Sequence, residues 1–436
     1  METALLAGLI LLVGIVVLIA LAVPIAVAIG LSSVIAIIAV LGVDRAVLTT
    51  SQQMFAGINS FTLLAIPFFI LAGVLMNNGG IASRLIDAAK VLVGRAPGSL
   101  AQTNVVANSL FGSVSGAAVA AAAAVGTVMG PRQREEGYDR SFSAAVNVAS
   151  APSGMLIPPS NTFIVYSLVS STSIAALFVA GYGPGLVWVL ACMIVVYVYS
   201  KRHQGLKTTD RVSFGVAVQT LVKAIPSLLM IVIVIGGILV GVFTPTESAA
   251  IAVVYCLVLG FAYRAIKVRD LPGILLNATK TTAIVMLLVG VSTAMSWLMS
   301  FARIPDLISD SLLGLTDSPT VILILMMIIL LIVGTFMDPT PAILIFTPIF
   351  LPIVMEFGIH PVHFGTMIVY NLCVGTITPP VGNVLFVGAR VAGLRIEPVI
   401  SKLIPFLIAL IIGLFLVVFV PELSLWLPTQ LDLIAP

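Results

Sequence analysis

Apolar stretches that are each long enough to cross a lipid bilayer recur from one end of this sequence to the other. A membrane-spanning helix needs about 20 consecutive, mostly apolar residues. Only 8% of the 436 residues are charged, whereas a soluble domain carries roughly 25%, so this chain could not cover a water-facing surface. We therefore expect an all-α protein that crosses the membrane many times. Residues 5–42 are expected to form two spans and not a cleaved leader.

The same sequence argues against several other classes of function. The three cysteines and three histidines are scattered without the spacing of metal ligands. The sequence contains no glycine-rich phosphate loop with its lysine, and nothing basic and aromatic indicates nucleic acid. An integral-membrane enzyme needs a convergent acid/base or metal cluster. We expect no transition metal, no nucleic-acid partner, no ATP hydrolysis by this chain and no enzymatic activity.

The two halves of the sequence share landmarks at a nearly constant separation, which indicates an internal repeat. Pro24 and Pro245 lie 221 residues apart, and the Pro-Pro segments at 153–160 and 374–381 have the same separation. Two further pairs lie 222 and 223 residues apart, namely Gly112 with Gly334 and Asp87 with Asp310. We expect one repeat over residues 1–205 and a second over residues 213–425.

Each half is expected to contain two spans, a third span, a short amphipathic segment, an interrupted segment, a Pro-Pro-broken segment and a closing span. The interrupted segments cover about 97–130 and 319–357, and the broken segments about 141–172 and 362–390. Glycine, proline and hydroxyl residues at membrane depth leave backbone groups unpaired, which is tolerated only inside protein or beside a water-filled cavity. We interpret the interrupted segments as re-entrant helical hairpins and the broken segments as helices unwound at mid-bilayer. A plain loop at each Pro-Pro pair is the alternative.

The distribution of charge predicts that the two repeats have opposite orientations. If the first hairpin enters from the cytoplasm and the second from outside, all but two of the 20 basic residues fall on cytoplasmic segments or their edges. The exceptions are Arg45 and Arg303, and acidic residues such as Asp306 fall outside. This bias follows the positive-inside rule and places both termini outside. Segments 81–87 and 303–310 are expected to be short amphipathic helices along the interface.

Unwound helices expose the backbone oxygens that a sodium ion binds. A first sodium site is predicted from Ser113, Ser115, Gly154, Ile157 and Pro159. An equivalent second site is predicted from Gly334, Asp338, Gly375, Thr378 and Pro380. Asp338 stands out because a carboxylate in an apolar run is costly and usually functional. Capping the helix that starts at the next proline is the alternative role for this aspartate, and the two roles are compatible.

The substrate is expected between the two hairpin tips, where helix N-termini favour anionic groups. The candidate contacts are Ser115, Gly116, Ser160, Asn161, Thr162, Thr340 and Asn383. Hydrogen bonding between helices is the alternative role for each of these hydroxyls and amides. The pattern as a whole predicts a secondary carrier with Na⁺ as coupling ion.

With these motifs assembled, the chain resembles over its full length the large membrane (M) subunit of TRAP transporters, the tripartite ATP-independent periplasmic carriers. The motifs are Leu64-Ala-Ile-Pro-Phe-Phe, Phe243-Thr-Pro-Thr-Glu-Ser, Gly334-Thr-Phe-Met-Asp-Pro-Thr and Ile377-Thr-Pro-Pro-Val-Gly-Asn383. The resemblance implies an inverted-repeat, elevator-type carrier of the bacterial inner membrane that imports carboxylates, including C4-dicarboxylates and sialic acid. It also implies two partners, a small four-helix membrane subunit (Q-type) and a periplasmic substrate-binding protein (P-type).

The resemblance places the family's sodium-binding backbone oxygens on the same glycine-to-proline breaks, and it places the family's aspartate of the second hairpin on Asp338. One departure is the first hairpin, where many relatives carry Ser-Gly-Ser with an acidic residue a few positions on. Here the motif is Ser115-Gly116-Ala117, and Ala121 stands where the acid is expected. The resemblance therefore predicts neither a hydroxyl contact at 117 nor an ionic role at 121.

Several alternatives remain open at this point. A self-sufficient dicarboxylate/Na⁺ symporter of related architecture would need no binding protein. An integral-membrane enzyme, a channel and a permease driven by a separate ATPase belong to other classes of function. The substrate is expected to be chosen largely by the separate binding protein.

Overall fold

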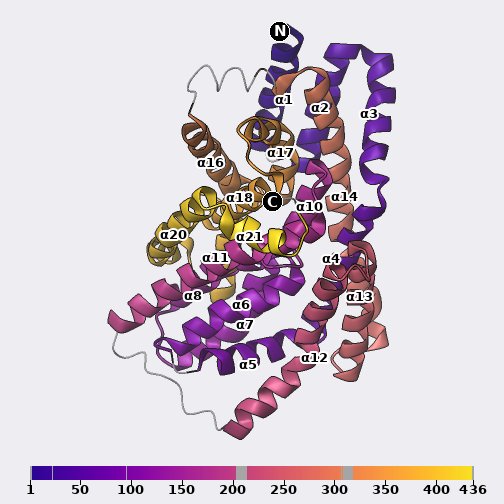
Figure 1. Cartoon of the computed structure of the whole chain (residues 1–436). Coiled ribbons are helices and arrows are strands. Elements are labelled where there is room, and N and C mark those ends of the chain that lie inside the picture. Colours follow the sequence, from indigo (N-terminus) through magenta and orange to yellow (C-terminus); the bar gives the residue numbers. More distant parts are fainter. Residues whose placement is uncertain are drawn as a thin grey trace.

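The computed structural model describes residues 2–21, 23–94, 96–202, 214–305, 307 and 318–434. Within these residues the regular secondary structure is entirely helical (Figure 1). The stretches that are long and apolar enough to cross a membrane number eight, namely Phe61–Asn78, Ile174–Arg202, Gly215–Leu239, Pro245–Ala262, Val268–Phe301, Pro319–Phe336, Pro339–Glu356 and Ile396–Phe419. The prediction of an all-α polytopic membrane protein is confirmed.

The helices of the first half are α1 (Glu2–Ala20), α2 (Ile25–Leu41), α3 (Val43–Ile58), η1 (Phe61–Leu64), α4 (Ala65–Asn78), α5 (Ile81–Val93), α6 (Ser99–Ser115), α7 (Ala118–Glu135), α8 (Arg140–Ser150), α9 (Ser153–Leu156), α10 (Asn161–Ser170) and α11 (Ile174–Arg202). The helices of the second half are α12 (Phe214–Leu239), α13 (Pro245–Ala262), η2 (Val268–Asp270), α14 (Leu271–Phe301), α16 (Pro319–Phe336), α17 (Pro339–Glu356), α18 (Pro361–Ile377), α19 (Asn383–Ala392), α20 (Ile396–Phe419) and α21 (Glu422–Gln430).

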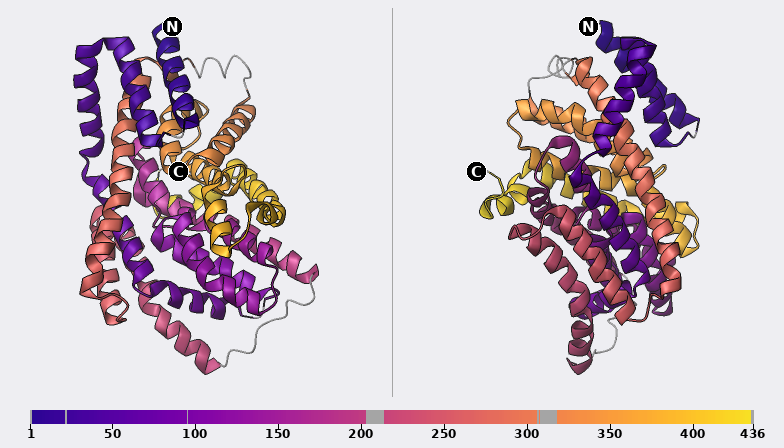
Figure 2. Two further views of the ribbon diagram at one scale, coloured as in Figure 1. Left: turned by 180° about the vertical axis from the view of Figure 1, so that it is seen from behind. Right: turned by 90° about the vertical axis from the view of Figure 1, so that its right-hand side faces the viewer.

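Two groups of helices lie side by side. Helices α2, α3, α4, α13 and α14 pack on one another along one side of the molecule, and α12 and α5 continue that group (Figures 1 and 2). The second group contains α6 to α11 and α16 to α20, and one hydrophobic core extends through both groups. Helices α4 and α14 contact α6 and α17, so they join the first group to the second.

Proline residues set several helix ends. Pro245 occupies the first turn of α13, where its missing N–H would have no intrahelical partner. Thr244 caps the same helix by accepting a hydrogen bond from the backbone N–H of Glu247 (3.2 Å), and the Glu247 carboxylate accepts from the backbone N–H of Thr244 (2.8 Å). The sequence Phe243-Thr-Pro-Thr-Glu-Ser is thus a helix-start signal with a capping box.

The proline pairs interrupt two helical segments. Pro158 and Pro159 lie between α9 and α10, and Pro379 and Pro380 lie between α18 and α19. A proline has no N–H to donate and disfavours helical geometry in the residue before it. The helical segments therefore end at Leu156 and Ile377, and the next helices begin at Asn161 and Asn383.

Three features differ from the sequence expectation or lie beyond it. The third span of the first half divides into α3, η1 and α4 around the non-helical Asn59 and Ser60, whereas the second half has the single long helix α14. A short helix, α21, follows the closing span. Helix α5 forms at the first expected amphipathic segment, but most of the second one, with Asp306 and Asp310, lies outside the described residues.

Candidate functional site

The first hairpin turns sharply between α6 and α7. Gly116 ends α6 in a left-handed conformation (φ +61°), which glycine adopts without steric cost. A Cβ at this position would lie only 2.9 Å from Nδ2 of Asn161. The tip of the first hairpin therefore touches the N-terminus of α10, immediately after the first helix break.

Both hairpins cross the broken helix of their own half at a pair of glycines. A Cβ on Gly112 of α6 would lie 2.6 Å from Cα of Gly154 in α9. In the second half, a Cβ on Gly375 of α18 would lie 2.5 Å from Cα of Gly334 in α16. Real Cβ atoms do not approach backbone this closely, so only glycine fits at Gly112, Gly154 and Gly375. The main chains consequently meet beside each break.

The second hairpin turns through extended backbone at Met337 and Asp338. The carboxylate of Asp338 accepts a hydrogen bond from the backbone N–H of Thr340 (3.2 Å) and so caps α17. Gly382 donates its backbone N–H to the carbonyl of Thr335 (3.0 Å), which ties the second hairpin to the second break. The capping role considered for Asp338 is therefore present, and its side chain is also exposed to the cavity described below.

The two broken segments meet at equivalent positions. Sγ of Cys373 lies 3.9 Å from the backbone carbonyl of Pro152, and these two residues are 221 positions apart in the sequence. That separation is the one that relates the landmarks of the two halves. The two breaks therefore lie on either side of a shared contact in the middle of the second helix group.

A cavity of about 550 Å³ lies between the two hairpin tips. The site residues predicted from the sequence that line it are Ser115, Gly116, Asn161, Thr162, Asp338, Thr340 and Asn383. The hydroxyl of Ser115 is buried and has no hydrogen-bond partner among the described residues. The structure thus gathers donors, acceptors and one carboxylate from both halves around one space, in the volume range of small-ligand pockets.

The remaining predicted residues lie beside the cavity and not on its surface. They are Ser113, Gly154, Ile157, Pro159, Ser160, Gly334, Gly375, Thr378 and Pro380. Ser160 is fully buried and donates to the Met155 carbonyl, which also accepts from Thr162 (2.9 Å). The hydroxyl of Thr378 donates to the carbonyl of Val374 (2.7 Å).

The cavity also has polar walls that the sequence reasoning missed. They comprise Asn77 and Asn78 at the end of α4, Asn277 and Thr281 on α14, and Thr376 on α18. Asn277 and Thr281 are one helical turn apart on the same face of α14, and that spacing is the signal that could have found them. The first helix group therefore closes one side of the cavity.

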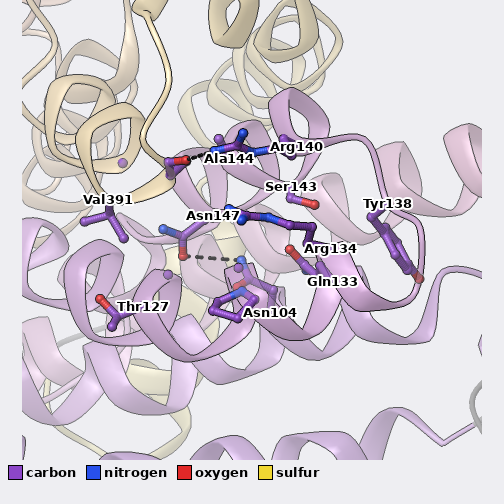
Figure 3. Close-up of a pocket in the computed structure, with 15 residues that line it drawn as sticks. Asn104, Thr127, Gln133, Arg134, Tyr138, Arg140, Ser143, Ala144, Asn147 and Val391 are labelled. Atoms are coloured by element: carbon purple, nitrogen blue, oxygen red, sulfur yellow. Dashed lines mark hydrogen bonds between the residues drawn. The ribbon is translucent and has the colours of Figure 1, made fainter.

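A second, smaller cavity of about 290 Å³ lies among α6, α7, α8 and α19. Its polar lining includes Asn104, Asn147, Ser143 and Arg134 (Figure 3). Asn104 donates its amide to Oδ1 of Asn147 (3.4 Å), and Arg140 donates to the backbone carbonyl of Ala392 (2.9 Å) (Figure 3). None of the site residues predicted from the sequence lines this cavity.

Comparison with known proteins identifies one family. The family described as "Tripartite ATP-independent periplasmic transporter, DctM component" matches residues 12–423. The "Uncharacterized protein YgiK" of Salmonella typhimurium is 53% identical, covering 88% of this chain and 89% of the relative. The "Sialic acid TRAP transporter large permease protein SiaM" of Vibrio cholerae is 40% identical, covering 87% and 88%. The "C4-dicarboxylate TRAP transporter large permease protein DctM" of Pseudomonas aeruginosa is 39% identical, covering 89% and 91%.

A solved structure shares the fold. The crystal structure of the Alcanivorax borkumensis YdaH transporter, whose title reports "an unusual topology", matches with a TM-score of 0.64. The match covers 89% of each chain at 14% sequence identity. At that identity the likeness concerns the arrangement of the helices alone.

Proposed function

This chain belongs to the DctM component family of the tripartite ATP-independent periplasmic transporters, and from that membership we propose that it is the large membrane subunit of a sodium-coupled importer of organic acids. Membership makes the chain a transport protein and not an enzyme, and it makes two further kinds of subunit part of the system. The coupling ion, the substrate class, the orientation and the site residues are our proposals.

The observation that carries the proposal is the cavity between the two hairpin tips. It combines hydroxyl and amide groups with the starts of α10 and α19, where backbone N–H groups without a capping side chain and helix dipoles favour an anion. A carboxylate of the substrate would accept hydrogen bonds from groups such as Ser115, Asn161 and Thr340. The names of the Vibrio cholerae and Pseudomonas aeruginosa relatives, which specify sialic acid and C4-dicarboxylates, support carboxylates as the substrate class.

We propose one sodium ion beside each helix break. The first would be held by backbone oxygens near Gly154, Ile157 and Pro159 together with the serines of the first tip, Ser113 and Ser115. The second would be held near Gly375, Thr378 and Pro380, with Gly334 and Asp338 from the second tip. The support is the close approach of each hairpin to its own break at the two glycine pairs. An ion at each crossing would stabilise the tip and thereby form one wall of the substrate cavity.

We further propose that the two halves are inverted repeats with re-entrant hairpins, and that both termini are periplasmic. The positive-inside bias of the basic residues supports this orientation. The second helix group, which carries both hairpins and both breaks, would move as an elevator against the group built on α2, α3, α13 and α14. The lining of the cavity by α4 and α14 supports this division, since substrate would lie at the boundary between the two groups.

The proposed partners are a small four-helix membrane subunit and a periplasmic binding protein that delivers the substrate. Both follow from the tripartite character of the family rather than from a surface of this chain. In a bacterial cell the complex would reside in the inner membrane.

Uptake by proteoliposomes tests the proposal. The vesicles contain this chain and its small membrane subunit, and sialic acid and a C4-dicarboxylate are each supplied with or without the binding protein, under a Na⁺ or a K⁺ gradient. We expect uptake of one acid that requires both the binding protein and Na⁺. Uptake of free acid without the binding protein would favour the self-sufficient symporter, and uptake that does not depend on Na⁺ would contradict the proposed coupling ion.

A further inference from the structure

A continuous row of polar side chains runs along the interface between α6 and the helices α8 and α9. Its members, called here the polar ladder, are Asn104, Asn108, Ser109, Asn147, Ser150 and Ser153. Asn108 donates to Oδ1 of Asn147 (3.1 Å) and to Oγ of Ser150 (2.8 Å). The hydroxyls of Ser109 and Ser153 lie 3.0 Å apart. All six side chains are buried, and none of them was singled out by the sequence reasoning.

The second half has the same crossing without the ladder. At the equivalent positions, 222 residues on in the hairpin and 221 in the broken helix, stand Met326, Leu330, Leu331, Ile368, Asn371 and Val374. Five of these six residues are apolar, yet α16 and α18 still meet at their glycine pair. Packing of a hairpin on its broken helix therefore does not require polar side chains. The ladder needs another explanation.

Two oxygens of the ladder are left without a protein partner. Oδ1 of Asn104 and Oδ1 of Asn108 are fully buried and accept no hydrogen bond from the residues that the structure describes. A buried carbonyl oxygen without a partner is costly, and water or a cation would satisfy it. The ladder therefore offers two such oxygens to a small polar species, whereas the equivalent crossing of the second half offers one, Oδ1 of Asn371.

The inner end of the polar ladder lies beside the first helix break, and its outer end lies at the smaller cavity. At the inner end, Ser153 directly precedes Gly154, and Ser109 is one helical turn from Ser113, so the ladder reaches the proposed first sodium site. At the outer end, Asn104 and Asn147 line the smaller cavity shown in Figure 3. That cavity also includes Arg134, Arg140 and the loop between α7 and α8. On the orientation proposed above, this is the cytoplasmic face.

We propose that the polar ladder is a hydrated passage through which the sodium ion of the first site leaves toward the cytoplasm. This inference rests on the proposed sodium coupling and assigns a release route to that site alone. The second site, backed by apolar residues, would release its ion only through the substrate cavity. Arg134 and Arg140 at the outer end disfavour a resident cation, so the passage would transmit the ion without competing with the site for it.

Exchanging residues between the two halves tests the role of the ladder in transport. Asn108→Leu gives the ladder the residue of the second half, and Leu330→Asn is the matched reverse variant. In the reconstituted transporter we expect Asn108→Leu to lower the initial rate of substrate uptake about tenfold or more while Na⁺ still raises the unfolding temperature. Leu330→Asn buries an amide among apolar residues and should lower the unfolding temperature without raising the rate of uptake. An unchanged rate in Asn108→Leu, or loss of both the rate and the Na⁺-induced stabilisation, would overturn the proposal.

Thiol accessibility tests hydration without relying on transport. Ser150→Cys and Asn371→Cys occupy equivalent positions, and each is placed in a chain whose three native cysteines are replaced by alanine. We expect a small cationic thiol reagent, added from the cytoplasmic side, to modify position 150 about tenfold faster or more than position 371. Equal rates, or faster reaction from the opposite side, would overturn the passage. If Na⁺ neither stabilises nor drives the wild-type transporter, the proposed function fails instead, and the labelling result still reports whether the ladder is hydrated.

Discussion

The two hairpins share one backbone arrangement and differ in the chemistry of their tips. Each turns between two helices, and each crosses its own broken helix at a glycine pair. The first tip offers the unpaired hydroxyl of Ser115 and no carboxylate, whereas the second carries Asp338. The comparison teaches that one repeated backbone arrangement can carry different side chains at its two tips, so the two proposed sites would bind in different ways. The first would bind through neutral oxygens and the second through a fixed negative charge.

The largest effect is expected from substitutions at the glycine pairs, the feature that the two halves share. Gly154→Ala and Gly375→Ala each place a methyl group against the main chain of the facing glycine, so the hairpin must move away from its break. Overpacking of this kind costs about 3 kcal/mol or more where backbone is the obstacle. We expect both variants to abolish uptake and to lower the unfolding temperature.

A matched glycine serves as the control for this experiment. A Cβ at Gly236 in α12 meets no atom of the described structure within 4 Å. Gly236→Ala should keep full uptake and gain up to about 1 kcal/mol from the higher helix propensity of alanine. Wild-type uptake in Gly375→Ala together with loss in Gly154→Ala would show that the two crossings are not equivalent.

The next largest effect is expected from removing the negative charge of Asp338, which distinguishes the second tip from the first. Asp338→Asn keeps an oxygen that can cap α17 and removes the negative charge, so we expect an unfolding temperature near that of the wild type. An interaction with a charged group contributes about 1.5–3 kcal/mol. Losing the charge of Asp338 should therefore weaken Na⁺ binding and raise the Na⁺ concentration for half-maximal uptake about tenfold or more. Asp338→Ala should in addition lose about 1 kcal/mol of stability with the cap. Glu356→Gln, at the other end of α17, is the matched control. An unchanged Na⁺ dependence in Asp338→Asn would leave Asp338 as a capping residue only.

A smaller effect is expected at the first tip. The hydroxyl of Ser115 is buried without a partner in the described part of the chain, so Ser115→Ala should cost no stability. If the hydroxyl binds the ion or the substrate, its loss should weaken binding by about 1 kcal/mol. The half-saturating concentration of that species for uptake should then rise roughly fivefold. A fall in the unfolding temperature would instead show that the hydroxyl has a structural role.

The smallest effect is expected at Ser113, two residues before Ser115. The hydroxyl of Ser113 already donates to the backbone carbonyl of Leu110 (3.0 Å) within α6. Ser113→Ala should therefore stay within about 0.5 kcal/mol of the wild type in stability and within about twofold in uptake. A loss as large as that of Ser115→Ala would show that Ser113 contributes as much as Ser115 to the proposed first sodium site, whereas an unchanged Na⁺ dependence would remove Ser113 from that site.

The helix breaks and hairpin turns could be read from the sequence because they depend on local chemistry. Proline pairs end helices wherever they stand, and the helices do end at Leu156 and Ile377. Apolar length likewise predicted most of the spans, but the two expected over residues 5–42 correspond to shorter apolar helices, Ala4–Ala20 and Ile25–Leu41, which are not among the eight stretches long enough to cross a membrane. The division of residues 43–78 into α3, η1 and α4 was missed because only two non-helical residues, Asn59 and Ser60, separate the pieces.

Contacts between distant segments could not be read in the same way. The sequence named Ser115, Asn161 and Asp338, which lie next to glycine or proline signals, and all three line the cavity. It did not name Asn277 of α14, because its one-turn spacing to Thr281 marks a polar face of the helix but does not show which segment that face contacts. It also named Ser160, whose hydroxyl donates a hydrogen bond to the Met155 carbonyl within the broken segment and does not line the cavity. The ladder was missed for the same reason, since Asn104 and Asn147 come together only through tertiary packing.

The most direct test of the central claim is an experimental structure of the transporter determined in Na⁺ and again in choline. The account predicts one compact density at each helix break in Na⁺, one beside Gly154 and Pro159 and one beside Gly375 and Pro380, with both absent in choline. Identical maps in the two salts, or ion density only away from the breaks, would contradict it.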